Sequence, residues 1–219
     1  MKNRQFNLKL MNQNIESKME KLCEYLQIQN DDDVINCLAQ AYRHKLKSVY
    51  AIKVHDHYYN LELQERPNFI GSYCKNTNQL TKAIIYENRF APIDLFDVEF
   101  SRYYILIFQY SRKFSMTKFN QFVKNEARKS QLYKLNTKSN YKWQFADEHI
   151  AKDLTGADHN GMSFIGLKNL QIPIIIDQSI EEEYIFVGGL HPLVKARLVV
   201  QQIIDSFKTY TVDITTQNE

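Results

Sequence analysis

The chain opens with a segment in which apolar and polar residues alternate. Over residues 4–11 the apolar positions are Phe6, Leu8 and Leu10, and the polar positions between them are Gln5, Asn7 and Lys9. A period of two residues is typical of a β-strand that buries one face and exposes the other. We therefore predict a strand here, with the three polar side chains on its outer face.

Two amphipathic helices are predicted after this strand. The first has an N-cap at Asn12 or Asn14 and ends near Leu26, because apolar residues recur every three or four positions. The second is capped by Asn30, and the three aspartates that follow suit the positive end of its dipole. Its apolar stripe contains Val34, Ile35, Leu38, Ala39, Tyr42 and Leu46.

One strand and two short helices cannot bury enough apolar surface by themselves. A lone strand also leaves its hydrogen-bonding edges open. Pairing with the same strand of a second chain solves both problems, since it gives an antiparallel ribbon packed on four helices. We therefore predict a homodimer whose N-terminal domain spans residues 1–48.

Over residues 2–47 this order of elements resembles the ribbon-helix-helix family of MetJ/Arc-like repressors. The most specific part is the strand sequence Gln-Phe-Asn-Leu-Lys at residues 5–9. In that family the outward strand side chains enter the major groove of duplex DNA. The resemblance implies that Gln5, Asn7 and Lys9 read the bases, since such side chains bond adenine and guanine edges. The residues implied to contact the nucleic-acid backbone are Lys2, Arg4 and Asn30.

This sequence departs from the family at the start of the second helix. The family holds a DNA phosphate there, as the helix dipole permits. Asp31, Asp32 and Asp33 would repel a phosphate at that position. Either the phosphate contact lies elsewhere, or DNA binding needs help from another region.

A β-rich pattern begins at residue 49 and extends to about residue 141. Short apolar runs predict strands at 49–54, 58–63, 69–74, 80–86, 96–100 and 103–110. The last of these is a continuous aromatic and β-branched run. A helix is predicted over 116–132, burying Phe119, Phe122 and Val123.

Positive charge is concentrated between residues 102 and 142. This stretch holds ten basic residues and one acidic residue, a net charge of +9, whereas the whole chain carries +3. Such asymmetry suggests a polyanionic partner, with aromatic residues between the basic ones available for base stacking. The residues assigned to phosphate contact are Arg112, Lys113, Lys118, Lys124, Arg128 and Lys129. A helix whose aromatic residues are simply core explains the pattern equally well.

The last region, residues 142–219, predicts the order strand, helix, helix, strand, strand, helix. The predicted elements are 142–145, 147–154, 162–170, 172–177, 184–187 and 192–207. This βααββα order resembles a type I KH domain, with Ile185–Gly189 followed by Val194–Arg197 as its final strand and helix. KH domains clamp nucleotides with a G-x-x-G loop. The loop between Gly156 and Gly161 is two residues longer and contains Asp158, so an ordinary α+β domain used for partner binding stays an alternative.

Sequence motifs of enzymes are missing. No nucleophile elbow, Walker loop or dinucleotide fingerprint occurs, so we expect no enzymatic activity and no cofactor. His55 and His57 would share one face of a strand with Cys74 downstream, but further ligands at a recognisable spacing are missing. We expect no metal site, and metal-responsive regulation is the weaker alternative.

Cysteine usage and hydropathy indicate the compartment. The three cysteines have no paired spacing, which favours a reducing environment. No apolar run approaches the length of a membrane span, so we expect a cytoplasmic protein without a membrane partner.

The sequence thus predicts an α+β protein with domains at residues 1–48, 49–141 and 142–219. We expect a homodimeric, sequence-specific regulator of duplex DNA, such as a transcriptional repressor or a plasmid or phage regulator. The alternative is a single-stranded RNA-binding protein that uses the basic segment 102–142 and a KH-like domain.

Overall fold

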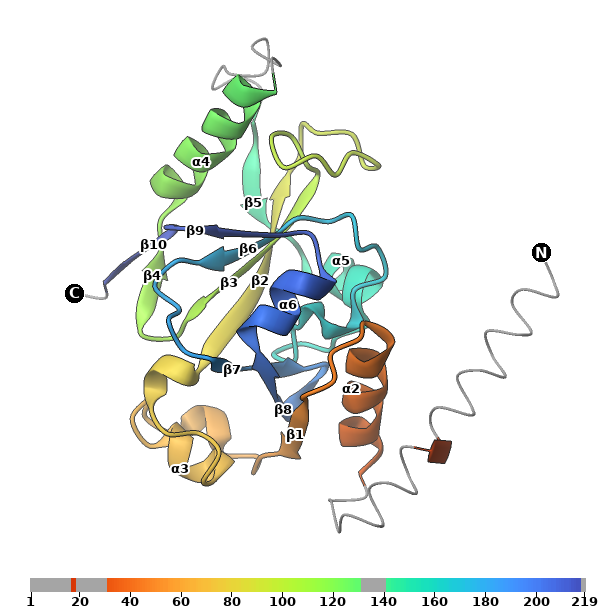
Figure 1. The fold of residues 1–219 in the computed structure, drawn as a ribbon, viewed down its shortest axis with the longest axis vertical. Coiled ribbons are helices and arrows are strands. Elements are labelled where there is room, and N and C mark those ends of the chain that lie inside the picture. Colours follow the sequence, from red (N-terminus) through yellow and green to blue (C-terminus); the bar gives the residue numbers. More distant parts are fainter. Residues whose placement is uncertain (1–16, 19–30, 131–140, 218–219) are drawn as a thin grey trace, which may run out of the picture.

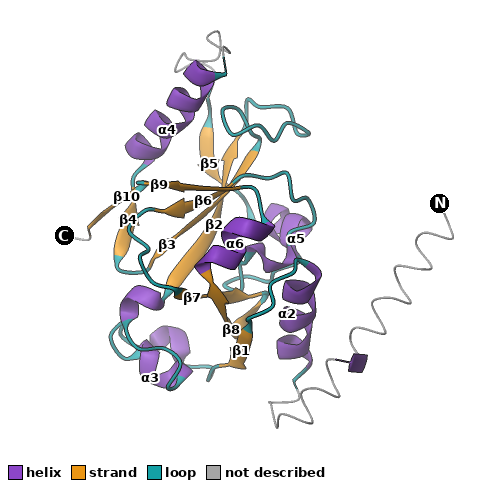
Figure 2. Cartoon of the chain, in the orientation of Figure 1, coloured by secondary structure: helices purple, strands orange, loops and turns teal. Residues whose placement is uncertain are grey.

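Ten strands and several helices form the fold in the computed structural model, which describes residues 17–18, 31–130 and 141–217 (Figure 1). The strands are β1 (Tyr50–Lys53), β2 (Thr81–Asn88), β3 (Tyr103–Gln109), β4 (Arg112–Phe114), β5 (Trp143–Phe145), β6 (Ile174–Asp177), β7 (Tyr184–Gly189), β8 (His191–Val199), β9 (Thr209–Val212) and β10 (Thr215–Gln217). The helices are α2 (Asp32–Arg43), α3 (Arg66–Ile70), α4 (Met116–Lys129), α5 (Glu148–Thr155) and α6 (Val200–Ser206), with 3₁₀ turns η1 (Tyr58–Asn60), η2 (Thr77–Gln79) and η5 (Phe164–Gly166). This is the predicted α+β class (Figure 2).

The larger sheet has the strand order β5-β2-β3-β6-β9. Its central strand β3 is buried along its whole length, which explains the continuous apolar run in the sequence. Side chains of β3 point alternately to two faces. Ile105 and Ile107 join the core shared with α2 and α6, whereas Tyr104, Leu106 and Phe108 pack on the other face beneath α4. The predicted helix at 116–132 is confirmed over Met116–Lys129, which form α4.

Helix α2 packs on the smaller sheet, whose order is β1-β8-β7. Its N-cap is Asp31 rather than Asn30, and the Asp31 carboxylate accepts from the backbone N–H of Asp33 at 3.0 Å. Its buried side chains are Val34, Ile35, Cys37, Leu38, Ala39 and Ala41, with Leu46 buried just beyond the helix. The apolar stripe predicted for this helix is therefore covered by other parts of the same chain, except for the exposed Tyr42. A ribbon-helix-helix module is not supported.

The strand and first helix of the predicted N-terminal module fall largely outside the described residues. The same holds for the proposed base readers and their neighbours, which are Lys2, Arg4, Gln5, Asn7, Lys9 and Asn30. Their DNA contacts stay predictions.

The predicted helix at 192–207 was wrong over residues 192–199, whereas α6 confirms it over Val200–Ser206. Residues 191–199 form β8, which hydrogen-bonds to β1 on one side and β7 on the other. Val194, Ala196 and Leu198 alternate into the core, a strand period that the sequence comparison with a KH helix overlooked. The predicted helix at 162–170 is only the 3₁₀ turn η5, so the KH order of elements is not present.

Three further predicted strands were wrong. Residues 58–63 contain η1, residues 69–74 begin with the last two residues of α3 and continue as a loop, and residues 96–100 are loop and turn. Pro67 in the first turn of α3 favours a helix start, and the apolar side chains of Tyr58, Ile70 and Cys74 cover the smaller sheet instead of joining it. The predicted domain boundary at residue 142 assigns β2 and β5 to different domains, although these two strands pair in one sheet.

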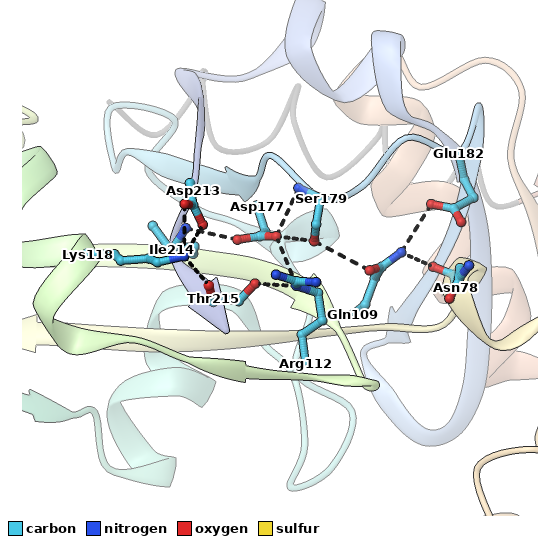
Figure 3. Close-up of polar contacts among 10 residues, drawn as sticks. All are labelled: Asn78, Gln109, Arg112, Lys118, Asp177, Ser179, Glu182, Asp213, Ile214 and Thr215. Carbon is cyan, nitrogen blue, oxygen red and sulfur yellow. Dashed lines mark hydrogen bonds and ion pairs between the residues drawn. The ribbon is translucent and has the colours of Figure 1, made fainter. Parts of the chain in front are cut away.

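A buried carboxylate fastens the last strands to the larger sheet. Asp177 ends β6 and is fully buried, and it accepts from the backbone N–H of Ile214 at 2.9 Å and of Ser179 at 3.0 Å (Figure 3). The Ser179 hydroxyl donates to the same carboxylate, and Nε of Arg112 lies 3.9 Å away. Arg112 in turn donates to Oγ1 of Thr215 at 2.6 Å, so β4, β6 and β10 meet at this point.

We expect Asp177→Ala to lower the free energy of unfolding by about 3 kcal/mol, because it leaves buried donors without an acceptor. The matched control is Asp213→Ala, which removes the exposed partner of Lys118 and should cost less than about 1 kcal/mol. Urea denaturation of both variants measures the difference. Equal losses would show that the Asp177 contacts add no more than a surface ion pair.

Candidate functional site

A cleft lies where the two larger sheets meet. Thr81 at the start of β2 donates its hydroxyl to the Phe186 carbonyl of β7 at 2.9 Å, and Leu80 forms a bridge to Phe186. Beside this junction is a cavity of about 260 Å³ lined by Tyr58, Tyr59, Leu80, Thr81, Lys82, Ala83, Ile84, Tyr110, Asn160, Met162, Phe186, Gly188 and Lys195. A neighbouring cavity of about 200 Å³ shares Ala83, Ile84, Asn160 and Met162 with it.

Lys195 is the buried amine of this cleft. It points from the face of β8 opposite Val194 and Ala196, and only 5% of it is exposed. Its Nζ donates to the Tyr59 hydroxyl and to the Pro192 carbonyl at 3.3 Å, and it lies 4.4 Å from the centre of the Tyr59 ring. Burial, with a smaller contribution from the charge of Arg66, lowers the pKa of Lys195 from 10.5 to about 7. Both protonation states of this amine are therefore populated near neutral pH.

Lys82 brings a second amine to the same cavity from β2. Its Nζ lies 4.9 Å from the centre of the Phe108 ring and 5.7 Å from that of Tyr110. Burial lowers the pKa of Lys82 as well. Among the described residues that line the cavity there is no carboxylate. The cavity therefore suits an anionic group or an oxygen that gains negative charge.

The glycine loop between α5 and η5 forms one rim of the cleft. A Cβ atom on Gly161 would lie 2.6 Å from the Leu190 carbonyl oxygen, and one on Gly188 would lie 2.4 Å from the Met162 carbonyl oxygen. The backbone N–H of Leu190 donates to the Gly161 carbonyl at 3.0 Å. Glycine is needed at both positions because two backbones approach closely. The loop considered as a nucleotide clamp thus packs on the β7–β8 turn.

The residues predicted to contact phosphates do not form one cluster. Arg112 belongs to the Asp177 network, and Lys118 donates to Asp213 at 2.8 Å (Figure 3). Lys129 pairs with Glu126 at 2.5 Å on α4. Lys113 lies on β4, and Lys124 and Arg128 share another side of α4.

The alternative of metal-responsive regulation is not supported by a cluster of metal-binding side chains in the described part of the chain. No group of three or more His, Cys, Asp or Glu side chains is arranged there to hold a metal ion. His55 and His57 follow β1 rather than lying on a strand, and Cys74 is buried as a free thiol. Within the same residues, every helix is too short or too polar to cross a bilayer.

The two lysines of the cleft could not be paired from the sequence, because they come from strands that are distant in the chain. Lys82 stands inside a predicted apolar strand, where a lysine is unusual, and this was the available signal. Lys195 was assigned to a helix, so its position opposite the core face of β8 could not be inferred.

Burial of Lys195 makes a testable prediction about stability. The unfolded chain binds a proton at this lysine up to its ordinary pKa of 10.5, whereas the folded chain releases it near pH 7. Folding is therefore favoured by rising pH between these values, by at most about 1.4 kcal/mol per pH unit for one proton. We expect the free energy of unfolding of the wild type to rise relative to Lys195→Met from pH 7.5 to 9.5. Parallel curves in urea denaturation at these pH values would contradict burial of this amine.

Comparisons with known proteins define the fold. No protein-family model matches the sequence, and no curated protein matches it. The structure is similar to that of a candidate trans-editing enzyme for prolyl tRNA synthetase, with a TM-score of 0.62, 10% identity, and coverage of 85% of this chain and 98% of that one. It is also similar to a scaffold protein for computational epitope grafting (TM-score 0.60, 11% identity, 86% and 99% coverage) and to the hypothetical protein APE2540 (0.57, 9%, 83% and 99%). At these identities the likeness concerns the fold alone.

Proposed function

We propose that the cleft hydrolyses the ester bond between a small amino acid and tRNA. The observation that carries this proposal is the pair of amines, Lys82 and Lys195, in one cavity whose lining contains no carboxylate. The fold likeness adds support, because one structural neighbour is a candidate trans-editing enzyme for prolyl tRNA synthetase. Editing sites hydrolyse wrongly formed aminoacyl esters.

The size of the cavity restricts the substrate. About 260 Å³ is less than a drug-sized ligand usually occupies. Its walls combine aromatic rings from η1 with Met162 and Phe186. A small aminoacyl group fits this space, and the rest of the tRNA would remain outside.

Lys195 supplies the base for hydrolysis. With a pKa of about 7, its neutral amine accepts a proton from water at neutral pH. The water oxygen then forms a bond to the ester carbonyl carbon. The carbonyl oxygen becomes an oxyanion, and the ammonium group of Lys82 stabilises its negative charge.

The second step completes the reaction. The oxyanion reforms the carbonyl, and the bond between the carbonyl carbon and the ribose oxygen breaks. The Lys195 ammonium returns its proton to the departing ribose oxygen, which restores the neutral amine. One water is consumed, and the products are the free amino acid and uncharged tRNA.

The sequence contains no hydrolase motif, and the expectation of no enzymatic activity rested on that absence. The likeness to a trans-editing enzyme at 10% identity bears only weakly on this expectation. A site assembled from β2, β8 and a glycine loop leaves no short motif in the sequence.

We expect the chain to release amino acid from tRNAs charged with small amino acids, and to lose at least about 100-fold in kcat on Lys195→Met, the range of general-base catalysis. Lys82→Gln should cost about 10- to 1000-fold, as removal of an oxyanion-stabilising group does. The rate should rise with pH around a midpoint near 7. The measurement is release of labelled amino acid from a panel of aminoacyl-tRNAs.

The matched control is Lys168→Met, which changes an exposed lysine outside the lining of the cleft. It should retain wild-type rates. Absence of release from every aminoacyl-tRNA of the panel would overturn the proposal, as would full activity of Lys195→Met.

A further inference from the structure

A row of aromatic side chains follows the edge strand β5. Tyr141, Trp143 and Phe145 occupy alternate positions, so they share one face of the strand. The Tyr141 and Trp143 rings stack with centroids 5.3 Å apart, and Trp143 stacks on Tyr86 of β2 at the same distance. Phe145 lies 5.4 Å from Tyr86, and 59% of it is exposed. The row is thus a platform that is fixed by β2 from beneath and open at one end.

A groove of about 530 Å³ separates this row from helix α4. It is lined by Met116, Thr117, Asn120, Gln121, Lys124, Tyr141 and Trp143. Arg128 lies one turn after Lys124 on the same side of α4. Glu126, the acidic residue of this helix, lies on the opposite side and pairs with Lys129. The groove therefore offers aromatic side chains, amides and positive charge, without a carboxylate in its described lining.

The platform leads to the cleft along β2. Lys82, Ile84 and Tyr86 alternate onto the same face of this strand. Lys82 and Ile84 line the first cavity, Ile84 and Phe145 line its neighbour, and Tyr86 contacts both Phe145 and Trp143. Lys82 and Tyr86 are four residues apart, which is about 13 Å along a strand. An extended chain of a few units can therefore reach from the groove to the cleft.

We propose that this groove and aromatic row bind the unpaired 3′ tail of an RNA. The leading base stacks on the exposed Phe145 ring, and the tail passes the groove-lining side of Trp143, whose ring faces are covered by Tyr141 and Tyr86. The amides of Asn120 and Gln121 bond base edges, and Lys124 with Arg128 holds phosphates. Stacked bases with a phosphate backbone match all three properties of the groove, whereas an apolar peptide would leave the lysine and amides without partners. This inference rests on the proposed function only for the direction of the RNA strand, whose 3′ end points to Lys82.

Trp143 is the single tryptophan of the chain and lines the groove, so its fluorescence reports occupation of the groove. Uncharged tRNA should quench its fluorescence, and the same tRNA without its unpaired 3′ nucleotides should bind at least about tenfold more weakly. Phe145→Ala should weaken binding of the intact tRNA about tenfold. Lys124→Gln should reduce the slope of log K against log salt by about 0.7, the value for one contact to a single strand.

The control is Phe69→Ala, which removes another half-exposed phenylalanine, on α3. It should bind like the wild type, and thermal melts of all variants should coincide because the changed side chains are at least partly exposed. Equal quenching by tRNA with and without its tail would overturn the inference. So would the absence of quenching, or equal quenching by polyglutamate.

Failure of this inference is separable from failure of the proposed function. Hydrolysis of aminoacyl-tRNA with no Trp143 quenching, and with full activity of Phe145→Ala, would overturn the platform and leave the cleft chemistry standing. Tail-dependent quenching without any hydrolysis would support the platform and overturn the chemistry.

Discussion

The junction of β2 with β7 governs the arrangement of this chain. Thr81 and Leu80 join the start of a strand in the larger sheet to Phe186 in the smaller one. Both contacts are buried, so the hydrogen bond is made where no water competes for it. Because the two sheets meet here, residue 82 of one and residue 195 of the other face a common space. Neither sheet alone would form the cleft.

Burial of the Lys195 amine in this space costs free energy, which the rest of the fold must offset. An amine buried among tyrosines loses its hydration, and its neutral form is favoured for that reason. The apolar cores on both faces of the larger sheet provide the compensating stability. A lysine buried in a cavity at a cost in stability is therefore a candidate functional residue, because stability and activity trade against each other.

Much of the secondary structure was predictable from local patterns, and most of the site was not. β3 is a continuous apolar run and α4 has the apolar period of a helix, and both elements were predicted correctly. β8 was predicted as a helix because Val194–Arg197 resembles the last helix of a KH domain, although the alternating Val194, Ala196 and Leu198 fit a strand between two others. Only tertiary pairing decides between those readings, as it does for α2, whose apolar stripe fits a dimer or a single chain equally well.

The position of β8 in the chain has a consequence for synthesis on the ribosome. β8 lies between β1 and β7, and its Arg197 is opposite Tyr50. Until residues beyond 190 emerge, β1 has no strand partner in the described fold and α2 lacks part of its cover. Such long-range pairing slows folding and prolongs the exposure of apolar surface in the nascent chain. The Lys195 amine arrives with the same strand, so the growing chain completes the smaller sheet and the lining of the cleft together.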